Sequence, residues 1–256
     1  MPAATRPTVA VWKFASCDGC QLSLIDCEDE LATLDAAISF THFSELTSAT
    51  EDGSYALSLV EGSISTAADE VRIHDIRRRS EVLITIGACA TAGGVQALRN
   101  YRQSAECLRI VYAHPAHIDT LAKATPIRDH VSVDYELRGC PVNPIQLREL
   151  IAAVLWGRAP RISSSSVCTE CKARGTVCLT VARGTPCLGP ITHAGCSALC
   201  PAFGRGCFGC YGSSENARVE TLARKLRESG VPEDELQRLL VSFTPTDPNF
   251  SSKETR

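Results

Sequence analysis

The chain has 256 residues, enough for one large domain and one small one, and its 44% hydrophobic and 21% charged residues are ordinary for a globular protein. The formal net charge of −3 gives no sign of a nucleic-acid or membrane partner. No apolar run approaches the roughly 18 residues of a membrane-spanning helix. The first residues, MPAATRPT, carry neither the apolar stretch of a signal peptide nor paired arginines, so we expect a cytoplasmic protein.

Apolar, β-rich runs alternate with helical stretches in the N-terminal part of the chain. The pattern predicts strands over residues 9–14, 38–43, 56–60, 82–86, 109–112 and 131–137. It predicts helices over residues 21–36, 66–79, from 94 to 98 and beyond, 118–124 and 144–155. Such alternation is typical of a parallel sheet covered by helices on both faces. We therefore expect residues 1–157 to form an α/β domain with a flavodoxin-like, doubly wound parallel sheet.

The rest of the chain, residues 158–256, has a different composition. Residues 157–166, GRAPRISSSS, are typical of a linker. Residues 167–212 show no helix or strand period, only Cys, Gly and Pro at short intervals, so we expect bound metal to organise them. Two C-terminal helices are predicted over residues 216–228 and 232–241, with a frayed tail from Thr246. The expected second domain is small, irregular and Cys-rich, and it ends in these helices.

The chain contains fourteen cysteines, and these residues are the best indication of its chemistry. A disulfide scaffold is one explanation, but such scaffolds are short, secreted and poor in hydrophobic core. Eight of the cysteines fall within 43 residues and suit two four-iron, four-sulfur ([4Fe–4S]) clusters, because each cluster takes four thiolate ligands. These eight are Cys168, Cys171, Cys178, Cys187, Cys196, Cys200, Cys207 and Cys210.

Spacing leaves the metal and the pairing of these eight cysteines open. The C-x2-C pairs at the two ends of the block resemble a zinc ribbon, which would leave the four inner cysteines for a second zinc site. The run from Cys196 to Cys200 matches the end of a bacterial ferredoxin motif, with His193 where that motif has a further cysteine. Because eight cysteines already suffice for two clusters, we interpret His193 as a hydrogen-bonding neighbour.

A second group of cysteines follows the predicted strands. Cys17 and Cys20 form a C-x2-C pair directly after the first strand, while Cys89 and Cys140 each follow a later strand in a Gly-containing loop. The carboxyl ends of parallel strands meet at one edge of a sheet, where ligand sites form. We therefore expect these four thiols to hold a third [4Fe–4S] cluster. A thioredoxin-like dithiol at the C-x2-C pair is the rival interpretation.

The motifs of other chemistries are missing from the sequence. No G-x-G-x-x-G follows a strand and there is no Walker A loop, so nucleotide binding is unsupported. No arrangement of Ser, His and acid indicates a hydrolytic site. A nickel-iron centre would need thiolate pairs of its own, and the three cluster sites leave only Cys27 and Cys107. We therefore interpret the chain as a carrier of electrons for chemistry done elsewhere.

Five segments together resemble the small subunit of nickel-iron hydrogenases. They are WKFASCDGCQLSL at residues 12–24, VEGSI at 60–64, GAC at 87–89, GCP at 139–141 and PCLGP at 186–190. The likeness is strongest to the delta subunit of cytoplasmic, bidirectional, NAD(P)-linked hydrogenases, also called sulfhydrogenases, and it extends over roughly residues 7–245.

The resemblance implies which residues hold each cluster. In that family a flavodoxin-like domain bears the proximal cluster, which here falls on Cys17, Cys20, Cys89 and Cys140. A C-terminal domain bears the medial and distal clusters, which here fall on the eight cysteines from 168 to 210. Glu61 matches the acidic position of the family's Glu-Gly motif beside the large-subunit interface, and we assign it no proton-transfer role.

The resemblance also implies a function and partners. The chain would relay single electrons through three [4Fe–4S] clusters, with no catalytic residue of its own, for a large subunit that interconverts dihydrogen with protons and electrons at a nickel-iron (NiFe) centre. A diaphorase that carries flavin (FAD) and an additional iron–sulfur subunit would exchange the electrons with NAD(P), in a heterotetramer or a dimer of it. Two alternatives stay open: a relay subunit of a deazaflavin-reducing hydrogenase or quinone-reductase-like complex, and a zinc-stapled interaction protein.

Overall fold

A computed structural model describes residues 6–27, 36–48, 50 and 53–250 of the chain. Five parallel strands form one sheet in the order β2-β1-β3-β4-β5. The strands are β1 (Thr8–Lys13), β2 (Ser39–Phe43), β3 (Tyr55–Glu61), β4 (Ser80–Ile86) and β5 (Tyr135–Leu137). This is the strand order of a flavodoxin-like, doubly wound sheet, so the predicted fold class is confirmed.

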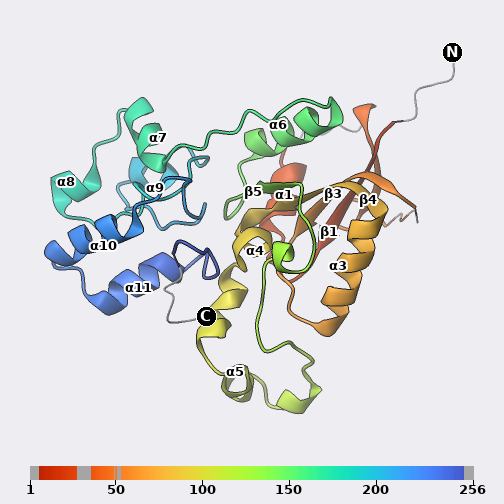
Figure 1. Cartoon of the computed structure of the whole chain (residues 1–256), viewed down its shortest axis with the longest axis horizontal. Helices are drawn as coiled ribbons and strands as arrows, with labels where there is room; N and C mark the ends of the chain where they lie inside the picture. The colour runs from red at the N-terminus through yellow and green to blue at the C-terminus, as the bar shows by residue number, and fades with distance from the viewer. Residues whose placement is uncertain (1–5, 28–35, 49, 51–52, 251–256) are drawn as a thin grey trace.

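Helices cover both faces of the sheet (Figure 1). On one face, helices α1 (Gly19–Ile25) and α6 (Pro144–Leu155) share a hydrophobic core with the side chains of Val9 and Val11. On the other face, helix α3 (Ala67–Arg79) packs with the side chains of Ala10 and Trp12. Successive residues of β1 therefore enter opposite cores, which is why the central strands are apolar without interruption.

Capping residues determine where the two long helices of the sheet domain begin. Thr66 caps α3: its hydroxyl accepts from the Asp69 N–H at 3.1 Å, and the Asp69 carboxylate accepts from the Thr66 N–H at 2.9 Å. Asn143 caps α6, where Pro144 occupies the favoured first position. Both helices match their predicted ranges closely.

Three predictions for this part were wrong or only partly testable. Residues 109–112, predicted as a strand, belong to helix α5 (Ser104–Val111) and its end. Residues 118–124, predicted as a helix, form an irregular segment. The helix predicted over residues 21–36 is α1, which begins at Gly19 and ends at Ile25; residues 28–35 lie outside the described part of the chain.

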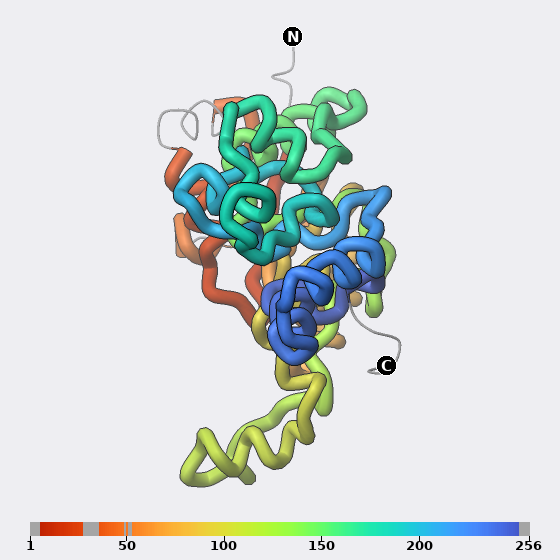
Figure 2. The backbone as a smooth tube through the Cα atoms, turned by 90° about the vertical axis from the view of Figure 1, so that its left-hand side faces the viewer, coloured from red at the N-terminus to blue at the C-terminus, as the bar shows by residue number. Residues whose placement is uncertain are grey.

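An arm projects from the body beside helix α4 (Gly87–Ala92), which follows β4 (Figure 2). It consists of the 3-10 helix η1 (Val95–Tyr101), α5 and the short turn η2 (Pro115–His117). Helix α5 buries none of its side chains, and Ile110 is 78% exposed. A further turn, η3 (Ile127–Asp129), brings the chain back to the sheet.

The Cys-rich region lies beside the sheet as a second layer of short elements (Figure 1). Contrary to the prediction, residues 167–212 contain three short helices: α7 (Val167–Ala173), α8 (Leu179–Arg183) and α9 (Leu199–Ala202). The two predicted C-terminal helices are present as α10 (Val219–Glu228) and α11 (Glu233–Val241). They form a small core with Leu188, Ile191 and Phe250.

The tail up to residue 250 is anchored, not frayed as predicted. Phe250 is 2% exposed, and the buried Asp247 carboxylate accepts from the Ser213 N–H at 2.8 Å. Among the described helices, none is both long enough and apolar enough to span a membrane.

Candidate iron–sulfur sites

All fourteen cysteines are free thiols in the structure. We divide the twelve predicted ligands into three groups of four and name the groups by their position. The edge group is Cys17, Cys20, Cys89 and Cys140; the cavity group is Cys196, Cys200, Cys207 and Cys210; the outer group is Cys168, Cys171, Cys178 and Cys187. Cys27 and Cys107 belong to none of them.

The edge group lies where the parallel strands end. Cys17 follows β1, Cys20 lies in the first turn of α1, Cys89 lies in α4 directly after β4, and Cys140 follows β5. Burial raises the pKa of the Cys20 thiol, and Glu61 and the Cys89 and Cys140 thiols raise it further. Burial also raises the pKa of Cys89 to about 12, with Cys140 and Cys17 as neighbours. The structure thus brings together the four cysteines that strand topology predicted to meet.

Two glycines bring backbone against these thiols. Gly87 has φ +87°, and a Cβ placed on it would lie 2.4 Å from the Cys20 sulfur. Gly94 has φ +62°, and its Cβ would lie 2.5 Å from the Cys89 sulfur. Both positions therefore require glycine for conformation and for space. Gly87 opens the GAC segment already singled out in the sequence, whereas Gly94 was missed, although a Gly-Gly pair soon after Cys89 was a visible signal.

Glu61, at the end of β3, fixes the start of α1. Its side chain is buried, at 1% exposure, and it accepts from the Cys20 backbone N–H at 3.2 Å and from the Gln21 side chain at 2.9 Å. Burial raises the pKa of the Glu61 carboxyl, and these two hydrogen bonds oppose the shift. Glu61 therefore positions the helix turn that carries Cys20. Gln21 was not identified from the sequence.

The cavity group lines a mostly apolar cavity of about 320 Å³. All four of its cysteines face this space, together with Val142, Leu199, Phe208 and, from the edge group, Cys140. The space equals about ten times the roughly 30 Å³ share of one water molecule in the liquid, far more than one metal ion fills. In the described part of the chain, no three His, Cys, Asp or Glu side chains converge as they would on a single ion.

The outer group is held by α7 and the segment up to Cys187. Burial raises the pKa of the Cys171 thiol to about 11, and the next three contributions come from Cys168, Cys187 and Cys178. Burial likewise raises the pKa of Cys168, and the Cys187 and Cys178 thiols raise it further. A Cβ placed on Gly189 would lie 3.3 Å from the Cys187 sulfur and 3.6 Å from the Cys168 sulfur. From these neighbours and from the lining of the cavity, we divide the eight C-terminal cysteines in chain order into the first four and the last four. The zinc-ribbon pairing would bring the two C-x2-C pairs onto one ion, and no such convergence is found among the described residues.

Direct contacts join the outer group to the cavity group. The backbone N–H of Cys207 donates to the sulfur of Cys187 at 3.2 Å, which links the cavity group to the outer group. The Glu170 carboxylate, between two outer cysteines, accepts from the Gly195 N–H at 2.9 Å and the Ala198 N–H at 3.1 Å, on either side of Cys196. The two C-terminal groups are therefore held in a fixed relation.

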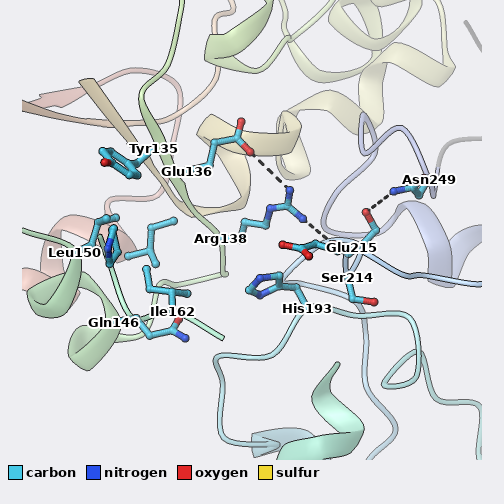
Figure 3. Close-up of a pocket in the computed structure, with 13 residues that line it drawn as sticks. Tyr135, Glu136, Arg138, Gln146, Leu150, Ile162, His193, Ser214, Glu215 and Asn249 are labelled. Carbon is cyan, nitrogen blue, oxygen red and sulfur yellow. Dashed lines mark hydrogen bonds and ion pairs between the residues drawn. The ribbon is translucent and has the colours of Figure 1, made fainter. Parts of the chain in front are cut away.

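A polar seam joins the sheet to the Cys-rich region (Figure 3). Arg138, two residues before Cys140, donates to the Ser213 carbonyl at 2.6 Å and lies 3.8 Å from the Glu136 carboxylate. Arg138 and His193 both line a second cavity, of about 400 Å³, and no cysteine lines it in the described part of the chain. The Nδ1 of His193 contacts the Ala194 carbonyl at 2.7 Å, and burial lowers the pKa of the ring. The structure thus places His193 as a neighbour of the seam, apart from the thiol groups.

The number of neighbouring thiols distinguishes a cluster site from a reactive dithiol. The thioredoxin-like interpretation needs only Cys17 and Cys20, whereas the structure places Cys89 and Cys140 beside them. Buried thiols that are protonated at neutral pH become thiolates when a metal binds and releases their protons. Groups of four Cys sulfurs, with glycine backbone pressed against them and one enclosing a cavity, fit [4Fe–4S] clusters. A doubly wound sheet with such groups defines the class of electron-transfer subunits.

Comparisons with known proteins agree with this class. Residues 17–154 match the family described as NADH ubiquinone oxidoreductase, 20 Kd subunit. The chain is 34% identical to sulfhydrogenase 2 subunit delta of Pyrococcus furiosus, over 92% of this chain and 98% of that protein. It is 31% identical to a subunit of the F420-non-reducing hydrogenase of Methanocaldococcus jannaschii, over 82% of this chain and 83% of that protein.

Solved structures give the same result. A chain of the NAD⁺-reducing [NiFe]-hydrogenase in its H2-reduced state matches with a TM-score of 0.57 and 27% identity, over 62% of this chain and 96% of that chain. The chain belongs to the family of nickel-iron hydrogenase small subunits, as the sequence motifs predicted. It is therefore a subunit of an oxidoreductase.

Proposed function

We propose that the chain relays electrons through three [4Fe–4S] clusters between the NiFe site of a large subunit and an electron acceptor of the same complex. The edge group would hold the proximal cluster, the cavity group the medial cluster and the outer group the distal cluster. Each cluster, when bound, takes up and gives off one electron at a time.

The observation that carries this proposal is that the three groups stand in series. Cys140 of the edge group also lines the cavity enclosed by the second group, and the Cys207 N–H of that group reaches the Cys187 sulfur of the third. Tunnelling falls steeply with distance, so a serial arrangement with short steps suits a relay. A set of unrelated structural metal sites would have no need of such contacts.

The surrounding residues supply orientation and shield the sites from water. The Tyr211 hydroxyl donates to the Pro141 carbonyl at 3.3 Å, and the Asn143 side chain donates to the Gly195 carbonyl at 2.7 Å. Both contacts tie the loop of Cys140 to the Cys-rich region. Val142 and Phe208 form apolar walls beside the cavity group, which limits solvent access and so affects the potential of a bound cluster.

Position suggests which partner meets which end. The edge group contains the exposed Cys17, so the large subunit would bind at the sheet edge. The outer group contains the exposed Cys178 and would face the acceptor, for which we propose an FAD-bearing diaphorase with an additional iron–sulfur subunit and NAD(P). The relatives described as sulfhydrogenase and NAD⁺-reducing hydrogenase support this acceptor. Free thiols throughout agree with the reducing cytoplasm as the compartment.

Iron analysis of anaerobically purified protein tests the proposal. We expect about twelve irons and twelve sulfides per chain, from three four-iron clusters. Cys178→Ala should leave about eight irons, and the control Cys107→Ala, which changes a cysteine outside all three groups, should keep about twelve. Four irons or fewer in fully loaded wild-type protein would refute the relay.

Double variants test the sorting of the C-terminal cysteines. Cys178→Ala with Cys187→Ala affects one proposed cluster and should leave about eight irons, whereas Cys178→Ala with Cys200→Ala affects two and should leave about four. The opposite pattern would show that the groups are wrongly divided. Co-purification of a nickel-containing large subunit tests the hydrogenase partner separately.

A further inference from the structure

A small cavity of about 80 Å³, which we call the inner cavity, lies next to Cys210. Cys210 also lines the larger cavity of the cavity group, so it borders both spaces. The end of α4, the residues around Cys210 and the C-terminal tail form the walls of the inner cavity. Its polar side chains include those of Thr91, Arg128, Arg138, Thr244, Asp247 and Asn249. Genuinely empty cavities in proteins are apolar, so a polar lining of this kind indicates a bound polar molecule.

One of these side chains needs a hydrogen-bond partner. Thr244 is 2% exposed, and in the described part of the chain its hydroxyl forms no hydrogen bond. A buried hydroxyl without a partner costs free energy, because it has given up its hydrogen bonds to water. Since Thr244 lines the inner cavity, a molecule bound there can supply the hydrogen bond.

The charges around the inner cavity balance. Arg128 and Arg138 contribute two positive charges to its wall. The Glu136 carboxylate accepts from Arg128 at 2.9 Å and lies 3.8 Å from Arg138, and the buried Asp247 carboxylate lines the cavity itself. Two cations and two anions leave no net charge to attract an ion, which favours a small neutral molecule that both donates and accepts hydrogen bonds. The volume suits roughly two or three water molecules, whose share in the liquid is about 30 Å³ each.

We propose that the inner cavity binds ordered water, which donates a hydrogen bond to the Cys210 thiolate and so raises the potential of the cluster held by the cavity group. A reduced cluster carries one more negative charge than an oxidised one, so a hydrogen bond to its sulfur stabilises the reduced form more. Thr244 is then a positioning residue, which acts on the cluster through the water that it holds. The proposal rests on the proposed function, because it takes the cavity group as a cluster site.

The inner cavity has a larger neighbour through which its water can exchange. Arg138, Ser213 and Asn249 line both the inner cavity and the cavity of about 400 Å³ at the polar seam. Figure 3 shows the Arg138 guanidinium at this boundary, between the Glu136 carboxylate and the segment that carries Ser214. Water therefore has a polar route past Arg138, and deuterium from D2O should reach the inner cavity.

Pulsed EPR and redox titration of the loaded hydrogenase complex test the water site. After exchange into D2O, the reduced cluster of the cavity group should show a coupled deuteron in the wild type. Thr244→Val removes the hydroxyl with little change in shape, and it should weaken this coupling. It should also lower the reduced-to-oxidised ratio of that cluster about tenfold at a fixed potential, which is a fall of about 59 mV in a one-electron midpoint.

Two further variants separate the water site from a general effect on the fold. Thr85→Val is the matched control: Thr85 is 0% exposed and its hydroxyl has no partner among the described residues, but it does not line the inner cavity. It should leave the deuteron coupling and all cluster potentials unchanged. Thr244→Ser keeps a hydroxyl and should give the wild-type coupling and potential. An unchanged potential in Thr244→Val, or the same shift in Thr85→Val, would overturn the proposal.

A crystal structure of the complex, grown with bromide, identifies the occupant. We expect water peaks in the inner cavity within hydrogen-bond distance of Thr244, and no anomalous signal from bromide. A bromide peak, or a cavity without density, would overturn the water site.

Iron content judges the proposed function on its own. Ordered water in the inner cavity of a chain that holds four irons or fewer would refute the relay and leave the water site in place. Three reducible clusters whose potentials are the same in wild type and Thr244→Val would leave the relay in place and refute the effect of the water.

Discussion

The substitution Gly87→Ala should remove the cluster of the edge group and leave the other two in place. Two effects combine at this position. The φ of +87° is strained for alanine, at a cost of about 1–2 kcal/mol. The new Cβ would also lie 2.4 Å from the Cys20 sulfur, where an ordinary contact needs 3.4–4 Å. The sulfur must therefore move by about 1 Å, roughly five times the 0.2 Å tolerance of a metal–ligand distance.

Gly184→Ala is the matched control. Gly184 has φ +66°, so it imposes a similar backbone strain, but a Cβ there meets nothing within 4 Å. We expect iron content to fall from about twelve to about eight per chain in Gly87→Ala and to stay near twelve in Gly184→Ala. The reduced-state EPR of Gly87→Ala should lose one cluster signal while the other two persist.

Two results would refute this reasoning. Full iron content and an unchanged EPR spectrum in Gly87→Ala would show that the backbone at Gly87 does not confine the Cys20 thiol of a bound cluster. Equal loss of iron in both variants would show that backbone strain, and not contact with the sulfur, is the cause.

Three further predictions concern the support of the sites. Glu61→Ala should lower the free energy of unfolding in anaerobic urea titrations by about 3 kcal/mol, because the Cys20 N–H and the buried Gln21 side-chain amide lose their hydrogen-bond acceptor. Glu61→Gln should lower it by less than half of that. Asp247→Ala should release the tail and speed cleavage near residue 247 in limited proteolysis, with unchanged cleavage elsewhere. His42 stacks on Trp12. Burial lowers the pKa of His42, and Arg72 and Arg79 lower it further. As pH falls below about 6.5, the histidine therefore takes up a proton more readily in the unfolded state than in the folded state, which destabilises the fold. The thermal unfolding midpoint should therefore drop between pH 7.5 and 5.5, and His42→Phe should flatten that drop.

The sheet was predictable because its strands are buried on both faces and are bounded by caps and turns. The errors lie where tertiary contacts override local preference. Residues 109–112, RIVY, are β-branched and aromatic, yet they lie in the projecting arm where no strand is available to pair with them. Residues 118–124 are held in an irregular path by side chains from η1: Asn100 pairs with both backbone groups of Ala124, and Arg99 reaches Thr120.

The sequence could predict the edge group but not the division of the eight C-terminal cysteines into two groups. The edge group followed from strand topology alone, because parallel strands deliver their carboxyl ends to one edge. The sorting of the eight C-terminal cysteines did not follow, because helices as short as α8 and α9 show no period and the loops between them are set by side-chain contacts. Glu170 is an example: its bonds to the loop of Cys196 give no signal in sequence spacing.

The order of the sites in space differs from their order along the chain. The chain leaves the edge group at Cys140, passes through residues 157–166 to build the outer group, and then returns to build the cavity group against Cys140. The return segment carries Cys207, whose N–H meets the Cys187 sulfur laid down on the outward path. An out-and-back path of this kind places the last four cysteines between the other two groups. The direction of the proposed relay, from edge to cavity to outer group, is therefore a property of the fold and not of the sequence order.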